Sequence, residues 1–208
     1  MAMSRIGIMG GTFNPIHFGH LLLAECARET VQMDEVWFVP TGYSYMKAEK
    51  GLDQKKMPTP QERLALTELA LQAHPQFRCL DIEVRREGNT YTCETLRELH
   101  AQHPEHDYFF IVGADCLFTI EHWRAPEQIF AQCTLVAAVR GDADIDSMQA
   151  KIDDLRGRFQ AQIQLLPFRR IELSSTEIRE RVGTGRSIRY MAPAPVIERI
   201  EQKGFYRT

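Results

Sequence analysis

Short apolar runs alternate along the chain with longer segments in which apolar residues recur at helical spacing. The short runs predict buried strands at Arg5–Met9, Val36–Val39, Phe77–Val84, Asp107–Val112, Cys133–Arg140 and Ile163–Leu166. The helical spacing predicts helices after Thr59 and at His20–Val31, Cys93–His103, Pro126–Ala131, Asp146–Gln160, Ser174–Val182 and Ala194–Gln202. Strands that alternate with helices indicate an α/β fold, with a central, mostly parallel sheet and helices on both faces.

Capping residues mark two of the expected helix starts. Thr59 precedes Pro60 at the first helical position, and Glu62 completes the pattern of a capping box. Thr92 can cap the helix that follows it. Residues 41–58 are polar, lysine-rich and without periodicity, which predicts a surface loop after the second strand.

The length and composition indicate one ordinary globular domain. The chain has 208 residues, of which 44% are hydrophobic and 25% charged, so disorder, collagen and coiled coil are poor fits. Neither an internal repeat nor an interdomain linker is evident. We expect a single domain over residues 1–208, with a helical C-terminal part from about residue 171.

Charge and cysteine usage limit the partners and the compartment. The net charge of −3 gives no overall attraction to nucleic acid. No apolar run approaches the roughly 20 residues that span a bilayer, and the N-terminus lacks the features of a signal peptide. Five scattered cysteines without a CxxC pair argue against a disulfide framework or structural zinc and fit a cytoplasmic protein. The oligomeric state stays open, and a homo-oligomer is compatible with the sequence.

The strongest chemical signal is the segment GGTFNPIHFGH, which follows the first strand. Gly10 and Gly11 let the backbone approach a ligand closely, and Thr12 adds a hydroxyl donor. His17 and His20 stand at the start of a helix, whose free N–H groups favour an anion. The segment matches neither the GxGxxG dinucleotide fingerprint nor a P-loop. It therefore predicts a phosphate site of another kind.

Two further segments carry groups suited to a nucleotide. In LSSTEIR, Ser174 and Glu177 form a capping-box pattern, and Ser175, Thr176 and Arg179 share one helical face. Hydroxyls, free N–H groups and a guanidinium together suit a polyphosphate. Residues 113–115 follow the strongly apolar strand at Asp107–Val112. If both strands lie centrally, these residues and the first segment meet at a topological switch point of the sheet.

The pairing of GGTFNPIHFGH with LSSTEIR resembles the HxGH nucleotidyltransferase superfamily. More closely, the chain resembles the bacterial nicotinate-nucleotide adenylyltransferases over nearly its whole length. The landmarks between the end motifs occur in order: Thr90-Tyr91-Thr92, Ile111-Val112-Gly113-Ala114-Asp115, Trp123-Arg124 and Val139-Arg140. The resemblance implies a Rossmann-like nucleotidyltransferase fold and the transfer of AMP from ATP to nicotinate mononucleotide with Mg²⁺, giving deamido-NAD and pyrophosphate. The implied partners are these small molecules, with no nucleic acid and no membrane.

The resemblance also implies roles for individual residues. His17 and His20 would contact the ATP phosphates as catalytic residues, together with Lys47 and Arg179. The other residues implied at ATP are Gly10, Gly11, Thr12, Phe13, Gly113, Asp115, Arg140, Ser175 and Thr176. Trp123 would stack on the pyridine ring of the mononucleotide, which Thr90 and Tyr91 would help to position. No protein side chain is expected to hold the Mg²⁺ ion, which would arrive on the ATP phosphates.

One segment departs from the family pattern. Family members often carry Pro-Pro-His-Lys in the loop after the second strand, whereas this chain has Tyr43-Ser44-Tyr45-Met46-Lys47. The resemblance therefore carries over only Lys47, as a phosphate contact.

Other interpretations stay open at this point. The acceptor could be nicotinamide mononucleotide or another phosphate, and a non-catalytic nucleotide-binding module would keep the same fold. His100, His103 and His106 have the spacing of metal ligands, but Pro104 interrupts them, which favours a solvated helix end. Trp123 fits an ordinary core position as well as a ligand contact.

Overall fold

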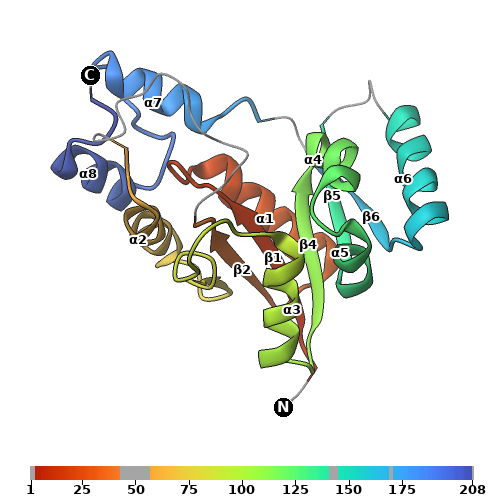
Figure 1. Ribbon diagram of the computed structural model, residues 1–208. Helices are drawn as coiled ribbons and strands as arrows, with labels where there is room; N and C mark the ends of the chain where they lie inside the picture. Colours follow the sequence, from red (N-terminus) through yellow and green to blue (C-terminus); the bar gives the residue numbers. More distant parts are fainter. Residues whose placement is uncertain (1–2, 43–56, 141–144, 169–170, 208) are drawn as a thin grey trace. The chain divides into compact units, whose positions relative to one another are not determined.

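The structure is a computed structural model that describes residues 3–42, 57–140, 145–168 and 171–207. Its strands are β1 (Arg5–Gly11), β2 (Glu35–Pro40), β3 (Phe77–Cys79), β4 (Asp107–Gly113), β5 (Thr134–Arg140) and β6 (Ile163–Phe168). Its helices are α1 (Phe18–Val31), α2 (Pro60–Leu71), α3 (Thr92–Gln102), α4 (Ala114–Thr119), the 3-10 helix η2 (Ile120–His122), α5 (Pro126–Gln132), α6 (Ile145–Phe159), α7 (Ser175–Gly183) and α8 (Ala194–Lys203). Figure 1 shows these elements along the chain.

The six strands form one sheet in the order β3-β2-β1-β4-β5-β6. β1 pairs in parallel with β4, β4 with β5, and β5 with β6. Opposite residues include Ile6 and Tyr108 in the first pair and Phe110 and Leu135 in the second. This order places β1 and β4 side by side at the centre, where a doubly wound sheet reverses its strand order. The predicted α/β fold with a parallel sheet is confirmed.

β4 illustrates why its sequence forms a central strand. Tyr108 through Val112 are all buried, in agreement with an apolar run that does not alternate. A strand of this kind needs cover on both faces, which parallel sheets receive from their crossover helices. α4 contacts β4 and β5, and α3 packs against α5 (Figure 1).

Several elements differ from the sequence predictions. α4 and η2 were not expected, and β3 ends at Cys79 rather than Val84 because the chain turns there, with Arg85 N–H donating to Asp81 O at 3.0 Å. The N-cap of α3 is Tyr91, and Thr92 is already helical. The capping box of Thr59 and Glu62 is confirmed, with both reciprocal hydrogen bonds present.

By packing, the chain divides into two compact units. The first contains residues 1–9, 23–37 and 91–170, and the second contains residues 10–22, 38–90 and 171–208. In the second unit, α2 packs against both β3 and α8. The single domain expected from the sequence stays a prediction. Among the helices in the described ranges, none has the length and apolarity that crossing a bilayer requires.

Candidate nucleotide-binding site

The turn that follows β1 is shaped by an aromatic ring folded back over a glycine. Phe13 is buried and has a φ of 46°, in the left-handed region that non-glycine residues seldom adopt. A Cβ on Gly11 would stand 2.9 Å from its ring, closer than ordinary van der Waals contact. The ring also meets the edge of His20 at 5.1 Å and packs on Phe38 at 5.8 Å. Gly11 is therefore required by the packing of Phe13, in addition to any ligand it lets approach.

A buried arginine from α2 is hydrogen-bonded to the backbone of this turn. Arg63 is 5% exposed, and its guanidinium donates to the carbonyl oxygens of Thr12, Thr41 (2.6 Å) and Gly42 (3.0 Å). Thr41 N–H in turn donates to Gly11 O at 2.9 Å. The segments that leave β1 and β2 are thus tied to each other through one planar cation, whose fork suits several acceptors at once.

The two histidines of the turn lie against each other. Their rings stack with centroids 3.7 Å apart and an interplanar angle of 26°. Nδ1 of His20 accepts a hydrogen bond from the backbone N–H of His17 at 3.3 Å. Because an accepting Nδ1 carries no proton, the neutral ring of His20 has its proton on Nε2. Nε2 is then the atom of His20 that can donate to an anion.

Gly19 allows the ring of His17 to take its position. A Cβ at residue 19 would lie 3.0 Å from both Cε1 and Nδ1 of that ring. The glycine between the two histidines therefore makes the stacked arrangement fit.

His17 is the more buried member of the pair. It is 5% exposed, and its Nδ1 is buried without a hydrogen-bond partner among the described residues. Burial lowers the pKa of His17 to about 4, although its backbone hydrogen bond opposes this. The ring of His17 is consequently neutral at pH 7, and its stacking places no positive charge beside His20.

This lowered pKa predicts a loss of stability in acid. In the unfolded chain, His17 takes up a proton below about pH 6.5, whereas in the native protein its ring stays neutral down to about pH 4. The neutral ring therefore contributes its full stability above pH 6.5, and this contribution is lost as the pH falls. Through this group alone, the free energy of unfolding should fall by about 3 kcal/mol between pH 7 and pH 4. Denaturant titrations at stepped pH, on wild type and His17→Asn, measure the difference. Parallel pH curves for the two proteins would contradict it, and His122→Asn, at an exposed histidine, is the matched control.

The second predicted motif begins α7 and reaches the turn. Ser174 caps the helix by accepting from Glu177 N–H at 3.1 Å, but the reciprocal bond of a capping box is not formed among the described residues. Ser175 Oγ donates to Pro15 O at 2.9 Å, and Arg179 donates to Asn14 O at 2.9 Å. Arg179 also donates to Thr176 Oγ1 at 3.2 Å, as their spacing suggested. Segments about 160 residues apart in the sequence thus meet within the second unit.

These contacts give Ser175 a structural task. In this arrangement its O–H proton points to a backbone carbonyl, so the hydroxyl holds the turn, and its contact with a phosphate stays a prediction. The groups of α7 that suit an anion are the N–H groups of its first turn and the guanidinium of Arg179. Ile178, which is fully buried in the same helix, fixes its orientation.

We call residues 10–20, with Arg63, Ser175, Thr176, Arg179 and Tyr206, the turn cluster. Two of its members, Arg63 and Tyr206, were not predicted from the sequence. Tyr206 donates its hydroxyl to Asn14 Oδ1 at 2.7 Å. Arg63 could have been noticed, because it falls on the apolar face of α2 together with the buried Leu66 and Leu71. An arginine on a buried face usually has several acceptors. Nothing in the sequence indicated the hydrogen bond of Tyr206, since an apolar C-terminal segment predicts only that its side chains are buried.

Three of the residues expected at ATP belong to the first unit. Gly113 is the N-cap of the six-residue helix α4, and Asp115 is exposed in its first turn. Arg140 ends β5 opposite Phe168. Lys47 lies outside the described residues.

The three residues expected at the mononucleotide, Thr90, Tyr91 and Trp123, differ in how their side chains are already engaged. Trp123 caps η2, meets Phe110 edge-on at 6.2 Å and has a buried Nε1 with no partner among the described residues. The guanidinium of Arg124 covers one face of the Tyr91 ring at 4.4 Å, so that face is not available for stacking. Thr90 is buried in the second unit, where a Cβ on Gly42 would approach its methyl group to 3.3 Å.

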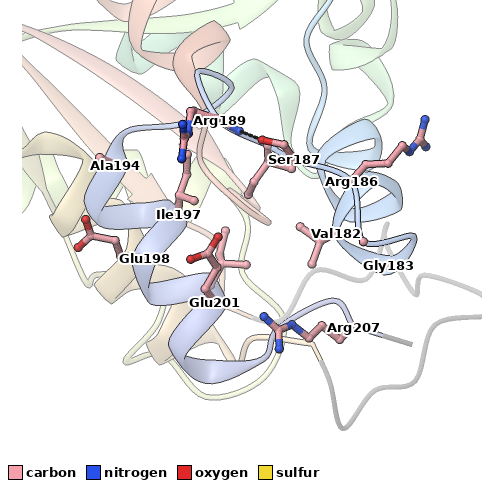
Figure 2. A pocket seen from close by; sticks show the side chains of 13 residues that line it. Val182, Gly183, Arg186, Ser187, Arg189, Ala194, Ile197, Glu198, Glu201 and Arg207 are labelled. Atoms are coloured by element: carbon pink, nitrogen blue, oxygen red, sulfur yellow. Dashed lines mark hydrogen bonds between the residues drawn. The ribbon is translucent and has the colours of Figure 1, made fainter.

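A separate cavity of about 730 Å³ lies between α7, the following loop and α8 (Figure 2). Its lining includes the basic Arg186, Arg189 and Arg207 and the acidic Glu198 and Glu201. Ser187 accepts from Arg189 N–H at 3.1 Å at its edge. None of the nucleotide-site residues expected from the sequence is among the described residues that line this cavity.

Comparison with known proteins places these features in a family. The cytidylyltransferase-like family model matches residues 8–181. The chain is 45% identical to the probable nicotinate-nucleotide adenylyltransferase of Lachnoclostridium phytofermentans, over 98% of this chain and 100% of that protein. It is 37% identical to the one of Exiguobacterium sibiricum, again over 98% and 100%. Its fold matches Plasmodium falciparum nicotinic acid mononucleotide adenylyltransferase complexed with NaAD, with a TM-score of 0.77 at 19% identity, covering 98% of this chain and 97% of that one.

Proposed function

The chain belongs to the cytidylyltransferase-like family and, within it, to the nicotinate-nucleotide adenylyltransferases, and we infer that it transfers AMP from ATP to nicotinate mononucleotide. The products are deamido-NAD and pyrophosphate, so the protein serves NAD biosynthesis. The observation that carries the proposal is the meeting of the turn after β1 with the start of α7, through Ser175 to Pro15 and Arg179 to Asn14.

The reaction needs what the turn cluster offers. The nucleophile is an oxygen of the acceptor's phosphate monoester, which is mostly a dianion at pH 7, so the protein need not supply a general base. The difficulty lies in holding two anions in line and in compensating charge on the non-bridging oxygens at the α-phosphorus. Nε2 of His20, the first turn of α7 and the guanidinium of Arg179 are donors of the right kind. His17, being neutral, would donate without adding charge.

The turn cluster suits anions better than cations. Its described residues offer imidazoles, hydroxyls, N–H groups and a guanidinium, whereas Mg²⁺ prefers carboxylate, carbonyl and water oxygens. We therefore propose that Mg²⁺ enters with ATP, bound by the triphosphate, where it neutralises part of the charge that develops. Lys47, by resemblance, would add a further cation on the phosphates.

The rest of the proposed site follows the resemblance. Gly10, Gly11, Thr12, Phe13, Gly113, Asp115, Arg140 and Thr176 would face ATP. Trp123 would meet the pyridine ring, and its buried, unpartnered Nε1 supports a polar partner there. We propose that the protein works in the cytoplasm, an environment that suits its five free thiols.

Turnover with a panel of acceptors tests the proposal. With ATP and Mg²⁺, nicotinate mononucleotide should release pyrophosphate and yield deamido-NAD, measured by a coupled pyrophosphate assay and by chromatography. Nicotinamide mononucleotide should react more slowly, and phosphopantetheine should not react. Faster turnover of the amide would reassign the acceptor. ATP binding without turnover of any acceptor would replace the enzyme by a nucleotide-binding module.

A further inference from the structure

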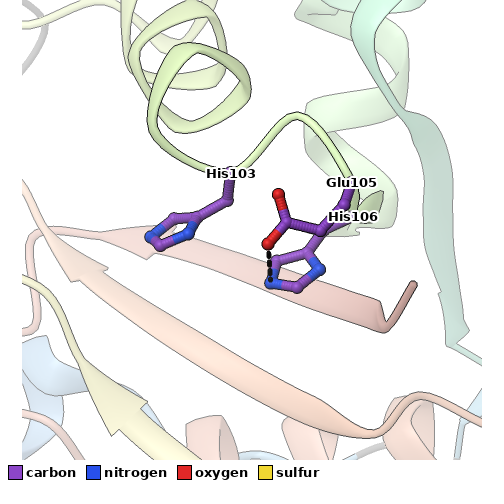
Figure 3. Close-up of side chains that lie close together, drawn as sticks. All are labelled: His103, Glu105 and His106. Carbon is purple, nitrogen blue, oxygen red and sulfur yellow. Dashed lines mark ion pairs between the residues drawn. The ribbon is translucent and has the colours of Figure 1, made fainter. Parts of the chain in front are cut away.

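A second group of polar side chains lies in the first unit, in the turn between α3 and β4 (Figure 3). His103, Glu105 and His106 each offer one ligand atom, and these atoms all lie within 4.8 Å of one another. In Figure 3 the carboxylate of Glu105 lies close to the ring of His106, with which it is paired. All three side chains are half-buried, whereas the sequence favoured a solvated helix end.

Pro104, which interrupts the histidine spacing in the sequence, is what brings the two rings together. His103 is the C-cap of α3, and His106 N–H turns back to donate to His103 O at 3.4 Å. A proline at the second position of such a turn is pre-set for it, and the first and fourth residues then come close. The rings of His103 and His106 are nearly parallel, with centroids 5.5 Å apart and an interplanar angle of 18°.

The third histidine of the series does not join this group. Nε2 of His100 is engaged with Gln132 O at 2.8 Å, and its ring meets Tyr108 edge-on. The three-residue spacing in the sequence therefore does not describe this group, in which Glu105 stands with His103 and His106.

The group contains polar atoms that lack partners. Oε1 of Glu105 and Nδ1 of His106 are buried and make no hydrogen bond among the described residues. Nε2 of His106 lies 4.0 Å from Oε1 of Glu105, beyond hydrogen-bond distance. Buried polar atoms normally have partners, and those that do not indicate an ion or water that completes them.

We propose that His103, Glu105 and His106 bind a divalent transition-metal ion of the zinc type. Two imidazoles and one carboxylate suit Zn²⁺, Co²⁺ or Ni²⁺, whereas Mg²⁺ would favour oxygen ligands alone. Three protein ligands leave at least one position for water. Ligand atoms about 2 Å from a zinc ion lie up to about 4 Å from one another. Side-chain rotations that move these atoms by about 1 Å would therefore bring all three within bonding distance of the ion. The bound ion would fix the turn that joins α3 to β4.

The fluorescence of a tryptophan beside His103 and His106 can report whether a metal ion binds there. The ring of Trp37 meets His103 at 5.6 Å and His106 at 5.9 Å, both edge-on. Co²⁺ bound by these rings should therefore quench the fluorescence of Trp37, and it should show the visible absorption of a nitrogen-and-oxygen site. Mg²⁺ should do neither. In Trp37→Phe the quenching should be lost and the binding of Zn²⁺, measured by calorimetry, retained.

Ligand variants decide whether these three residues hold the ion. His103→Ala and Glu105→Gln should each bind Zn²⁺ at this site at least about 100-fold more weakly than wild type, with one fewer ion bound per chain. His122→Ala is the matched control, because its exposed ring lies beside Glu121, whose carboxylate is already paired with Lys151 and Arg158. Turnover in Mg²⁺ reports the fold of each variant and should be unchanged, since none of these residues belongs to the turn cluster.

Two results would overturn the proposal. One is the same Zn²⁺ affinity and stoichiometry in wild type, His103→Ala and Glu105→Gln, which would place any bound ion elsewhere, for example at His17 and His20. The other is a Trp37 emission that Co²⁺ leaves unchanged in wild type, which would identify the group as aromatic packing around Trp37. If His103→Ala fails to fold, the Zn²⁺ affinity of Glu105→Gln decides between the two outcomes, because glutamine keeps the size of the side chain.

Discussion

His20→Ala is expected to lower kcat by about 10²–10³-fold, the scale for losing one preorganised donor to a transition-state oxyanion. His20 is positioned for that task by two contacts: its Nδ1 accepts from the backbone N–H of His17, and its ring stands perpendicular to that of Phe13. The remaining ring nitrogen, Nε2, carries the proton that a phosphate oxygen accepts. Since the interaction matters most as charge builds at the α-phosphorus, the KM for ATP should change much less than kcat.

Steady-state kinetics with ATP and nicotinate mononucleotide measures this effect. His122→Ala, which removes an exposed imidazole, is the control and should turn over at the wild-type rate. Wild-type turnover in His20→Ala would remove His20 from the catalytic residues. An increase in KM at unchanged kcat would assign it to ground-state binding of ATP instead.

Arg63→Met should be the most destabilising single change among the residues around the turn. It keeps an unbranched apolar chain of similar length but leaves the carbonyls of Thr12, Thr41 and Gly42 without their buried donor. Each unsatisfied buried acceptor costs about 1–3 kcal/mol, so we expect a loss of about 3 kcal/mol or more in the free energy of unfolding. That is a large part of the 5–15 kcal/mol typical of a domain.

Activity should fall along with stability in Arg63→Met. Residues 12 and 42 leave β1 and β2, and a displacement of about 1 Å in the groups that align two anions can cost about 100-fold in rate. Denaturant unfolding and kcat/KM, measured well below the midpoint of unfolding, separate the two effects. Arg63→Lys should recover part of the stability, because an ammonium can reach some of the acceptors but lacks the planar fork.

The control for this prediction lies in the same unit. Arg189 is exposed, and its replacement by Met should change the free energy of unfolding by no more than about 0.5 kcal/mol. An equally small change in Arg63→Met would show that water or neighbouring donors satisfy the three carbonyls, and the role of Arg63 as a tie between the two strand ends would be wrong.

The sequence was most informative where local chemistry decides the structure. Apolar runs located the strands because a buried parallel strand cannot tolerate polar residues on either face. The capping box at Thr59 was predictable because its hydrogen bonds join residues only three apart. The α7 spacing correctly put Thr176 and Arg179 on one face for the same reason.

Other features depended on contacts between distant segments. A sequence does not indicate that the hydroxyl of Ser175 is used by Pro15 O, or that Arg63 serves three carbonyls from two loops. The histidine series near residue 103 shows the same limit. Pro104 favoured a solvated helix end, but the chain turns there and brings the half-buried side chains of His103, Glu105 and His106 together.

By itself, the sequence determined the α/β class, the strands and the two motifs whose residue types suit phosphates, because hydrophobic periodicity and side-chain chemistry are local properties of a chain. Only the tertiary structure decided that residues 14–15 and 175–179 touch, that His17 is buried and neutral while His20 presents Nε2, and which side chains are occupied in holding the backbone. Those outcomes depend on burial and on the orientation of single hydrogen bonds between segments far apart in sequence, which no local pattern encodes.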